Sequence, residues 1–543
     1  MKKIAVTTSL LLLSLLLLQA LLGLFFRPPT PEEIRHLAAS QRVAVVSQSY
    51  AILVNILIGL VLAYALTISP IFSWLPNGHR VKLTLALGDA FWLMAAFAVL
   101  SYRHTFVAML YDHTQLITHL AIVVLVVSWF WFVREHYARR RPFWDELREM
   151  FGLLAVAALL AAAAAFYARA DAARGVTLGV WVAAFAVLPL ARALSKALLD
   201  RAGLWQRAAL IVGTGTNARD AYRAICSEKN LGYRVQAFMR CEVNGDDAST
   251  HDAMPDDLPV LDPQGDLAQQ FKRLGDPQIV LALDSLGSSA SQQLVQGLTT
   301  LRQPVHVIPS IRGLPLFGTE LSHFFSHEVL MLTVRNNLAR RSNRWLKRAF
   351  DLAGASAMLL LLAPFMLVIA WRVRRSGASA FYGHTRIGQN GVPFQCLKFR
   401  SMRPDADRFL QELLAKDPAA RSEWAQNFKL RNDPRITPIG HFLRRTSLDE
   451  LPQLINVIRG EMSLVGPRPV VRDELQRYGD AAPLYLEAKP GITGLWQVSG
   501  RSDTTYAERV SLDAWYVRNW FLWYDIAILI KTIGVVLQRR GAY

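Results

Sequence analysis

Long apolar runs alternate with short polar segments over the first two hundred residues of this 543-residue chain. Each of six runs has roughly the length that an α-helix needs to cross a bilayer. They cover residues 4–26, 43–66, 84–101, 116–133, 150–168 and 176–191. Asp89 is the one acidic residue inside them, whereas a transporter or proton pump needs ionisable groups along its path. The pattern therefore predicts a helical bundle that anchors the chain or serves as an assembly surface.

Positively charged loops predict how this bundle is oriented. Residues 134–149 hold five arginines, and further arginines and lysines follow the last span, so both segments are expected on the cytoplasmic side. Residues 27–42, which hold three arginines, fit less well as an outside loop. The run 4–26 follows Lys2 and Lys3 and has the pattern of a signal peptide or of an anchor. We favour an anchor, because the run is long and lacks a clear small-residue cleavage site.

From residue 207 the pattern changes to that of a soluble α/β domain. Short apolar strands are expected at 208–212, 234–239, 278–283 and 305–309, with helices near 264–274 and 287–301. This alternation predicts a Rossmann-like parallel sheet. Gly213-Thr214-Gly215-Thr216-Asn217-Ala218 has the form G-x-G-x-x-A, which could present backbone N–H groups to a pyrophosphate or could simply allow a tight turn.

A further apolar run, 352–371, has basic residues before and after it and Pro364 near its middle. A proline inside a helix removes a backbone donor and favours a kink. The residues alone fit a kinked span and a broken, re-entrant helix equally well. We favour the re-entrant helix, because it keeps both basic flanks and the following domain on the cytoplasmic side.

The composition supports a membrane protein with soluble parts. Hydrophobic residues make up 52% of the chain, and the formal net charge is +18, which suits an anionic membrane surface or phosphate-bearing ligands. No nucleic-acid partner is expected, because the basic residues are scattered and no recognised nucleic-acid motif occurs. Three widely separated cysteines support neither a disulfide framework nor a metal site.

Residues 381–402 are predicted to form a hairpin with a glycine-containing turn. The alternation of side chains along its second strand places Lys398 and Arg400 on one face. Two neighbouring cations without acidic neighbours favour an anionic ligand, although a solvated strand face would look the same.

The centre of the candidate chemistry is the carboxylate pair Asp449-Glu450, preceded by Arg444 and Arg445. Ser447 and Glu450 have the spacing of a capping box, which alone could explain both residues. Pro452 indicates that a helix begins near Asp449 or Glu450. Two ionised carboxylates at this spacing repel unless arginines or a divalent cation neutralise them, and Mg²⁺ shared with a diphosphate would do so.

Three loops around this pair offer further arginines: Arg435 in 432–440, Arg468 in the Gly-Pro-Arg-Pro loop, and Arg501 after the glycine-rich segment 489–500. An arginine suits bidentate contact with a phosphate. Each loop taken singly could be a solvated turn. Together their cations indicate a substrate with several negative charges.

Four segments in this order, KFRSM, SLDELPQL, VGPRP and KPGITGLWQVSGR, resemble the bacterial sugar transferases, the large monotopic phosphoglycosyl transferases. The resemblance covers about 340–543, and the preceding region is similar to the undecaprenyl-phosphate galactose phosphotransferase branch. It implies a membrane α-helical bundle over 1–200, a Rossmann-like cytoplasmic domain over 201–335, and an α/β catalytic domain over 340–543 with a re-entrant membrane helix at 347–372. Many members of the family have Ser-Pro at the helix break, where this chain has Ala363-Pro364.

The resemblance also implies roles for single residues. Asp449 is expected to be the nucleophile and Glu450 a magnesium ligand or its helper. The expected nucleotide- and phosphate-binding residues are Lys398, Arg400, Arg435, Arg444, Arg445, Arg468 and Arg501. The implied reaction transfers hexose 1-phosphate from a UDP-hexose, with galactose preferred over glucose, to undecaprenyl phosphate, and initiates synthesis of exopolysaccharide, capsule or O-antigen.

Two other functions remain open at this point: a non-enzymatic polysaccharide assembly subunit, and a nucleotide-sugar oxidoreductase that uses 213–218. We expect a multi-pass, homo-oligomeric protein of the bacterial inner membrane. Near the C-terminus, Trp515, Tyr516, Trp520, Trp523 and Tyr524 have the pattern of an aromatic belt at a bilayer surface. The segment 526–537 is too short to cross the membrane and carries Lys531, so it is expected to lie on the membrane surface. A buried amphipathic core helix would fit the same pattern.

Overall fold

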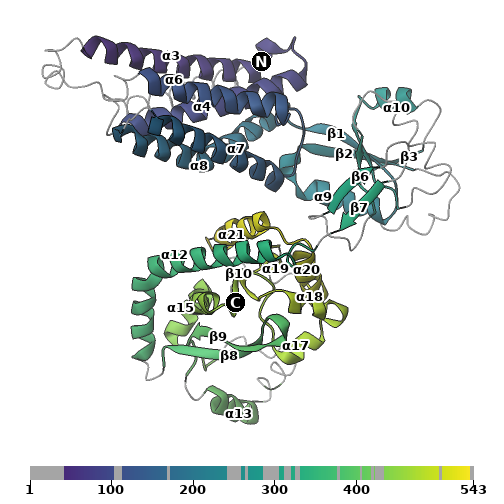
Figure 1. The fold of residues 1–543 in the computed structure, drawn as a ribbon. Helices are drawn as coiled ribbons and strands as arrows, with labels where there is room; N and C mark the ends of the chain where they lie inside the picture. The colour runs from purple at the N-terminus through teal and green to yellow at the C-terminus, as the bar shows by residue number, and fades with distance from the viewer. Residues whose placement is uncertain are drawn as a thin grey trace. The chain divides into compact units, whose positions relative to one another are not determined.

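The chain divides into two compact units, Met1–Ser310 and Ile311–Tyr543 (Figure 1). The computed structural model describes residues 42–102, 113–167, 171–240, 258–262, 267–284, 305–310, 319–323, 330–334, 336–375, 379–403, 406–417, 421, 433–499 and 504–537. The first unit contains a helical bundle and a parallel sheet, and the second contains the carboxylate pair. The predicted residue boundaries of three separate domains stay a prediction.

The first part of unit 1 is a bundle of long apolar helices (Figure 1). They are α3 (Arg42–Ile68), α4 (Asn77–Tyr102), α6 (His113–Ser128), α7 (Phe143–Tyr167) and α8 (Asp171–Arg201). A π-helical turn, Trp129–Val133, extends α6. Met94, Phe130, Leu154, Trp181 and Leu188 are among the side chains that form the buried core of the bundle.

Four of the six predicted spans are confirmed as helices that are long and apolar enough to cross a membrane. They lie at Asn77–Leu100, Leu116–Val133, Phe143–Tyr167 and Thr177–Arg201. The predicted span at 43–66 falls in helix α3, and the predicted span at 4–26 lies outside the described residues.

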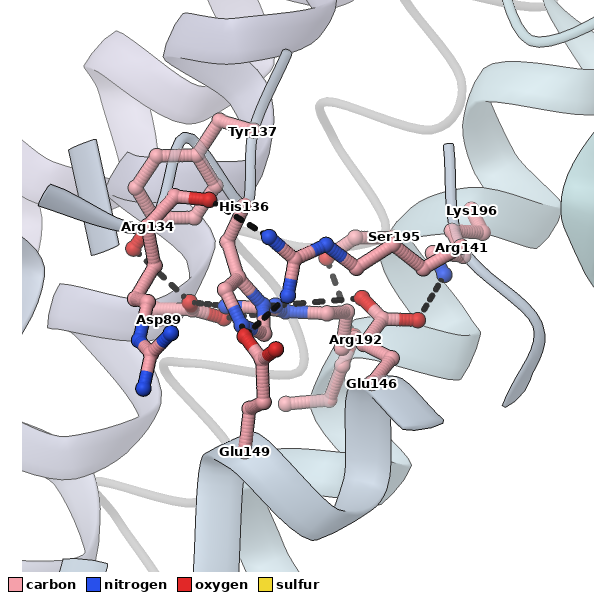
Figure 2. Close-up of polar contacts among 11 residues, drawn as sticks. Asp89, Arg134, His136, Tyr137, Arg141, Glu146, Glu149, Arg192, Ser195 and Lys196 are labelled. Carbon is pink, nitrogen blue, oxygen red and sulfur yellow. Dashed lines mark hydrogen bonds and ion pairs between the residues drawn. The ribbon is translucent and has the colours of Figure 1, made fainter. Parts of the chain in front are cut away.

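Helices α7 and α8 extend beyond the predicted apolar runs and bring buried charges with them (Figure 2). Arg192 of α8 forms ion pairs with Asp89 of α4 and with Glu146 of α7, and Lys196 also pairs with Glu146. The hydroxyl of Tyr137 donates to Asp89 at 2.9 Å. Glu146 lies before the predicted run 150–168 but within the candidate span Phe143–Tyr167, so this longer span contains a buried acid that the apolar run did not include.

The second part of unit 1 is a five-stranded parallel sheet in the order β3-β2-β1-β4-β5. Its strands are β1 (Arg207–Val212), β2 (Tyr233–Met239), β3 (Val260–Leu261), β4 (Gln278–Leu281) and β5 (His306–Val307). Helices α9 (Thr216–Ser227) and α10 (Leu267–Arg273) belong to the same α/β region. This is the strand order of the first five strands of a Rossmann fold, so the predicted Rossmann-like sheet is confirmed. The helix expected near 287–301 and Glu242, the weak acidic candidate after the second strand, lie outside the described residues.

The glycine-containing turn before α9 is occupied by a side chain of the protein itself. Oδ1 of Asp284 accepts hydrogen bonds from the backbone N–H of Asn217 and from the hydroxyl of Thr216, both at 2.8 Å. A Cβ on Gly215 would lie 1.5 Å from Oδ2 of Asp284. The carboxylate of Asp284 thus takes the position at the helix N-terminus where a pyrophosphate oxygen would bind in a dinucleotide-binding turn.

Unit 2 is built from short strands and helices around the carboxylate pair. Its strands are β6 (Thr319–His323), β7 (Leu330–Val334), β8 (Phe381–Ile387), β9 (Pro393–Phe399), β10 (Ser463–Val465) and β11 (Gly491–Thr493). Its helices are α12 (Arg341–Arg374), α13 (Ala406–Lys416), α15 (Pro438–Thr446), α16 (Gln453–Arg459), α17 (Arg472–Gln476), α18 (Ala482–Glu487), α19 (Leu495–Ser499), α20 (Tyr506–Arg518) and α21 (Leu522–Leu537). The predicted hairpin is confirmed, since β8 and β9 pair in antiparallel fashion.

Helix α12 contains Pro364 and bends sharply along its length (Figure 1). Its first part is fastened to the core of unit 2 by buried polar contacts: Lys347 donates to Asp525 at 2.7 Å, and Asp351 accepts from the hydroxyl of Ser463 at 3.0 Å. Leu360, Leu361 and Leu367, further along the helix, are exposed. The first part of α12 is thus held by buried polar contacts, and the later part, which we call its apolar arm, exposes leucine side chains.

The aromatic residues near the C-terminus do not form the predicted belt. Tyr516, Trp520 and Trp523 are buried, and the first two belong to the hydrophobic core of unit 2. Because Tyr516 and Trp520 both donate hydrogen bonds to Asp525, their polar atoms point into the protein and not toward a bilayer surface. The alternative of a buried amphipathic helix fits α21 better, although Ile530 and Ile533 remain exposed.

Candidate active site

The carboxylate pair lies in a tight chain reversal between two helices. Helix α15 ends at Thr446 and is followed by Ser447, which has the left-handed φ of 56°, and Leu448–Glu450 form one turn of 3₁₀-helix. Helix α16 begins at Gln453, after Pro452. The predicted capping box does not form, because the side chain of Ser447 makes no capping hydrogen bond. The α-helix also begins later than Asp449 or Glu450, where we expected it.

Lys398 of β9 contacts both carboxylates. Its Nζ donates to Oε1 of Glu450 at 2.6 Å and lies 3.9 Å from Oδ2 of Asp449. Asp449 is buried, with 9% of its surface exposed, and Glu450 is half-buried. The hairpin strand thus supplies positive charge to the two adjacent carboxylates, which we had expected from arginines or a divalent cation. The predicted role of Lys398 in binding the nucleotide and phosphates stays a prediction.

The surroundings shift the pKa values of the two carboxylates in opposite directions. Burial raises the pKa of Asp449, and the positive charge of Lys398 only partly opposes this effect. Burial would also raise the pKa of Glu450, but the charges of Lys398 and Arg468 outweigh it and bring that pKa below its ordinary value. Such a difference between neighbouring acids is typical of sites where each has its own role.

Two of the predicted arginines are held by neighbouring side chains of the site. Nε of Arg444 donates to the hydroxyl of Ser401 at 2.9 Å, and burial lowers the pKa of this guanidinium. Arg435 is buried and forms a bidentate pair with Asp433, with Nε to Oδ1 at 2.8 Å and Nη2 to Oδ2 at 2.6 Å. The guanidinium of Arg435 is therefore largely committed to a carboxylate of its own loop.

Two other predicted cations are more accessible. Arg400 donates from Nη2 to Ser379 at 3.0 Å and lies 5.7 Å from the ring of Tyr382. Its Nε is buried and has no hydrogen-bond partner among the described residues. Arg445, in the last turn of α15, is exposed. Both can donate to an anion that enters the site.

Arg468 is presented by two loops whose backbones touch. Strands β10 and β11 pair in parallel through Ser463 and Gly491 and through Val465 and Thr493. A Cβ on Gly491 would lie 2.1 Å from the backbone nitrogen of Gly466, so no side chain fits between the loops. Arg468 itself is exposed and lies 5.6 Å from the ring of Trp496.

The backbone of Arg468 contacts a buried acid, Asp513 of α20. It accepts a hydrogen bond from the hydroxyl of Tyr478 at 3.0 Å. Burial raises the pKa of Asp513 to about 7, although Tyr478 and the backbone of Arg468 counteract the shift. Asp513 thus ties the loop of Arg468 to helix α20.

Sequence reasoning missed several residues that shape the site. Ser401 and Trp496 lie inside the segments KFRSM and KPGITGLWQVSGR, so membership of these motifs was an available signal. Nothing in the local pattern marked Asp433 as the partner of Arg435. Arg501 lies outside the described residues, and its predicted role stays a prediction.

The donor set is compatible with magnesium. Mg²⁺ commonly binds one or two protein carboxylates and completes its shell with substrate phosphates and water. Asp449 and Glu450 supply two neighbouring carboxylates. Among the described residues, no third histidine, cysteine or acid joins them in one cluster, so the remaining ligands would come from substrate and solvent.

Two neighbouring carboxylates in contact with a lysine, arginine-bearing loops and membrane-type helices together define a membrane enzyme that acts on phosphate-bearing substrates. The chain belongs to the bacterial sugar transferase family, whose model matches residues 342–539. It is 44% identical over 478 residues to the UDP-galactose-lipid carrier transferase of Erwinia amylovora, covering 86% of this chain and 98% of the relative.

Two further relatives differ in how much of the chain they match. The undecaprenyl-phosphate galactose phosphotransferase of Salmonella typhimurium is 44% identical over 476 residues, which is 86% of this chain and 98% of the relative. The UDP-glucose:undecaprenyl-phosphate glucose-1-phosphate transferase of Escherichia coli is 33% identical over 274 residues, which is 49% of this chain and 55% of the relative. The likeness to the galactose enzymes therefore includes the helical bundle and the parallel sheet.

Proposed function

We propose that this protein transfers galactose 1-phosphate from UDP-galactose to undecaprenyl phosphate and releases UMP. The observation that carries this proposal is the contact of Lys398 with both Asp449 and Glu450 at the centre of the family's matched region. The choice of galactose over glucose rests on the names of the relatives that match nearly the whole chain. The product begins a polysaccharide chain, such as an exopolysaccharide.

In the first step, Asp449 acts as the nucleophile. One of its carboxylate oxygens forms a bond to the sugar-linked phosphorus of UDP-galactose, and the bond from that phosphorus to the bridging oxygen breaks. UMP leaves with the electron pair, and galactose 1-phosphate stays on Asp449 as an acyl phosphate. The raised pKa of Asp449 reflects a poorly solvated carboxylate, which is a more reactive nucleophile than one shielded by water.

In the second step, a phosphate oxygen of undecaprenyl phosphate attacks the same phosphorus. The bond to Asp449 breaks, the carboxylate is regenerated, and undecaprenyl-diphosphate-galactose forms. Arg444, Arg445, Arg400 and Arg468 surround the pair and bind the phosphates of the donor and of the lipid; Arg435 and Arg501 complete the predicted set with less direct support. A Mg²⁺ bound by Glu450 and the diphosphate would neutralise charge on the substrate.

We place the catalytic region on the cytoplasmic face of the inner membrane, with α12 as a re-entrant helix. Pro364, the bend of α12 and its exposed apolar arm support this arrangement. Single cysteines in place of Ser342 and Arg375, in a background with the three native cysteines changed to serine, test it. Both positions should react with a membrane-impermeant maleimide from the cytoplasmic side alone, whereas a straight span would expose them on opposite sides. We also propose a homo-oligomer, which the mass of the detergent-solubilised protein tests.

Release of UMP from UDP-galactose in the presence of undecaprenyl phosphate tests the reaction. We expect Asp449→Asn to lower the rate by a factor of about 10³ or more, because the amide is not a nucleophile toward phosphorus. Full activity of that variant would remove the mechanism. An inactive wild-type protein would favour a non-enzymatic assembly subunit, and a tightly bound nicotinamide cofactor would favour an oxidoreductase. Faster release from UDP-glucose than from UDP-galactose would reassign the sugar.

A further inference from the structure

One fully buried amide group joins all three segments that supply the active-site charges. Asn456, on α16, has 0% of its surface exposed. Its helix begins three residues after Glu450. Its side chain reaches the strand that carries Lys398, and its backbone caps the turn that leads to β10 and Arg468.

The contacts with the strand resemble those of a neighbouring strand. Strands β8 and β9 form a two-stranded sheet, so the second edge of β9 needs other partners for its backbone groups. Nδ2 of Asn456 donates to the carbonyl of Gln395 at 2.8 Å, and Oδ1 accepts from the N–H of Leu397 at 3.0 Å. These bonds fix the backbone immediately before Lys398.

The remaining contacts extend to the other side. Nδ2 of Asn456 also donates to Oε2 of Glu461 at 2.5 Å. The backbone carbonyl of Asn456 accepts from the N–H groups of Gly460 and Glu461, both at 3.0 Å, and so ends the helix. Met462 and Ser463 then lead directly into β10. Both donors and the acceptor of the amide are used: two bonds end on β9, and the third ends on Glu461, at the turn before β10.

We propose that Asn456 is a positioning residue for the transfer reaction: its contacts with β9 hold Lys398 at its distance from Asp449 and Glu450. The proposal rests on the function proposed above. It follows from three facts: the amide is buried, it bonds to the backbone of β9 at Gln395 and at Leu397, directly before Lys398, and no other side chain among the described residues bonds to the backbone there. Loss of the clamp frees the strand to shift by a fraction of an ångström, and lysine contacts depend steeply on such shifts.

Asn456→Ala and Val457→Ala form a matched pair for the test. Val457 is also fully buried and lies on the same helix, so its truncation weakens the core without removing the amide. In the full-length protein, we expect Asn456→Ala to lower kcat for UMP release about 10- to 100-fold, with KM for UDP-galactose changed less than about threefold. Val457→Ala should keep kcat within about threefold of wild type, even if its melting temperature falls as far as that of Asn456→Ala.

A second readout does not depend on turnover. Acylation of Lys398 by acetic anhydride, followed by mass spectrometry, reports how firmly Glu450 holds the ammonium. The rate at Lys398 should rise at least about fivefold in Asn456→Ala and stay near the wild-type value in Val457→Ala. Equal acylation in all three proteins would overturn the proposal, as would equal kcat in the two variants. An inactive wild-type enzyme with the expected acylation pattern would instead reject the proposed function and keep the positioning role.

Discussion

Lys398 and Glu450, 52 residues apart in the chain, are joined by a hydrogen bond of 2.6 Å at the centre of the candidate site. The same ammonium lies 3.9 Å from Asp449. The resting protein thus supplies its own counter-charge to the two acids, before any substrate or metal arrives. The arrangement makes the lysine as important to the proposed chemistry as the acids themselves.

Replacing Lys398 with methionine should lower kcat/KM for UMP release by about 10²-fold, because the nearest positive charge to both acids is lost. Lys398→Arg keeps the charge and should retain a measurable part of the activity, though not all, since the planar guanidinium cannot contact the acids in the same way. Steady-state assays on both variants check this. Equal loss in the two variants would indicate that shape, and not charge, is what Lys398 contributes.

Asp513 gives the catalytic unit a specific pH dependence. Its pKa is raised to about 7 in the folded state, above the ordinary value of 3.8, so folding favours its protonated form, and stability is lost as pH rises from about 4 to about 7. Asn cannot ionise and can still accept from Tyr478. The melting temperature of Asp513→Asn relative to wild type should therefore increase between pH 5 and pH 7 and level off above that.

Between pH 5 and pH 7 the free-energy difference between the two proteins should change by about 3 kcal/mol, at about 1.4 kcal/mol for each pH unit. Thermal denaturation at pH 5, 6, 7 and 8 measures it. A constant difference across this range would mean that Asp513 is ionised in the folded protein throughout.

The carboxylate of Asp284 should act as an internal cap of α9. Asp284→Ala removes the acceptor for Asn217 and Thr216 and should destabilise the parallel-sheet region by about 1 kcal/mol, whereas Asp284→Asn should cost less. Because the anion position is already filled, wild-type protein should show no binding of NAD by calorimetry. Tight NAD binding to the wild type, lost in Gly215→Ala, would contradict this view of the turn.

Removing only one partner of the Arg192–Asp89 ion pair should destabilise the bundle more than removing both partners. Arg192→Met leaves Asp89 and Glu146 buried with too little positive charge, which costs about 3–5 kcal/mol in buried pairs. The double variant Asp89→Leu/Arg192→Met should be more stable than Arg192→Met alone. Melting temperatures in detergent for the two single variants and the double variant test the coupling, and strictly additive losses would argue against it.

Periodicity predicted the regular elements well, whereas features that depend on contacts between distant residues could not be predicted from the local pattern. Alternation along 393–399 gave β9, and apolar runs gave the strands of the parallel sheet, because in both cases burial follows the local pattern. The spacing of Ser447 and Glu450 predicted a cap, yet Glu450 binds a lysine from a distant strand. Similarly, the apolar run 150–168 began after Glu146, and the run 176–191 ended before Arg192 and Lys196, because a hydropathy window does not register that these charges neutralise one another.

The same limit applies to the site. The motifs marked Asp449, Glu450 and Lys398 as site residues, but the contact of Lys398 with the two acids, the pairing of Arg435 with Asp433 and the contacts of Asn456 could not be read from spacing. All three depend on which side chains meet across loops. The contact of Gly466 with Gly491 is of this kind too, since only the fold brings the two backbones within reach.

The buried charges of the bundle have a consequence for how the chain enters the membrane. Arg141, Arg192 and Lys196 lie in segments whose positive charge indicated orientation, yet each is paired with an acid in the folded protein. During insertion these partners are not yet assembled, and the cations are free to act as topological signals. Once the helices pack, the same cations form ion pairs that hold the bundle together. The finished bundle therefore shows lipid head groups less positive charge than its biogenesis used.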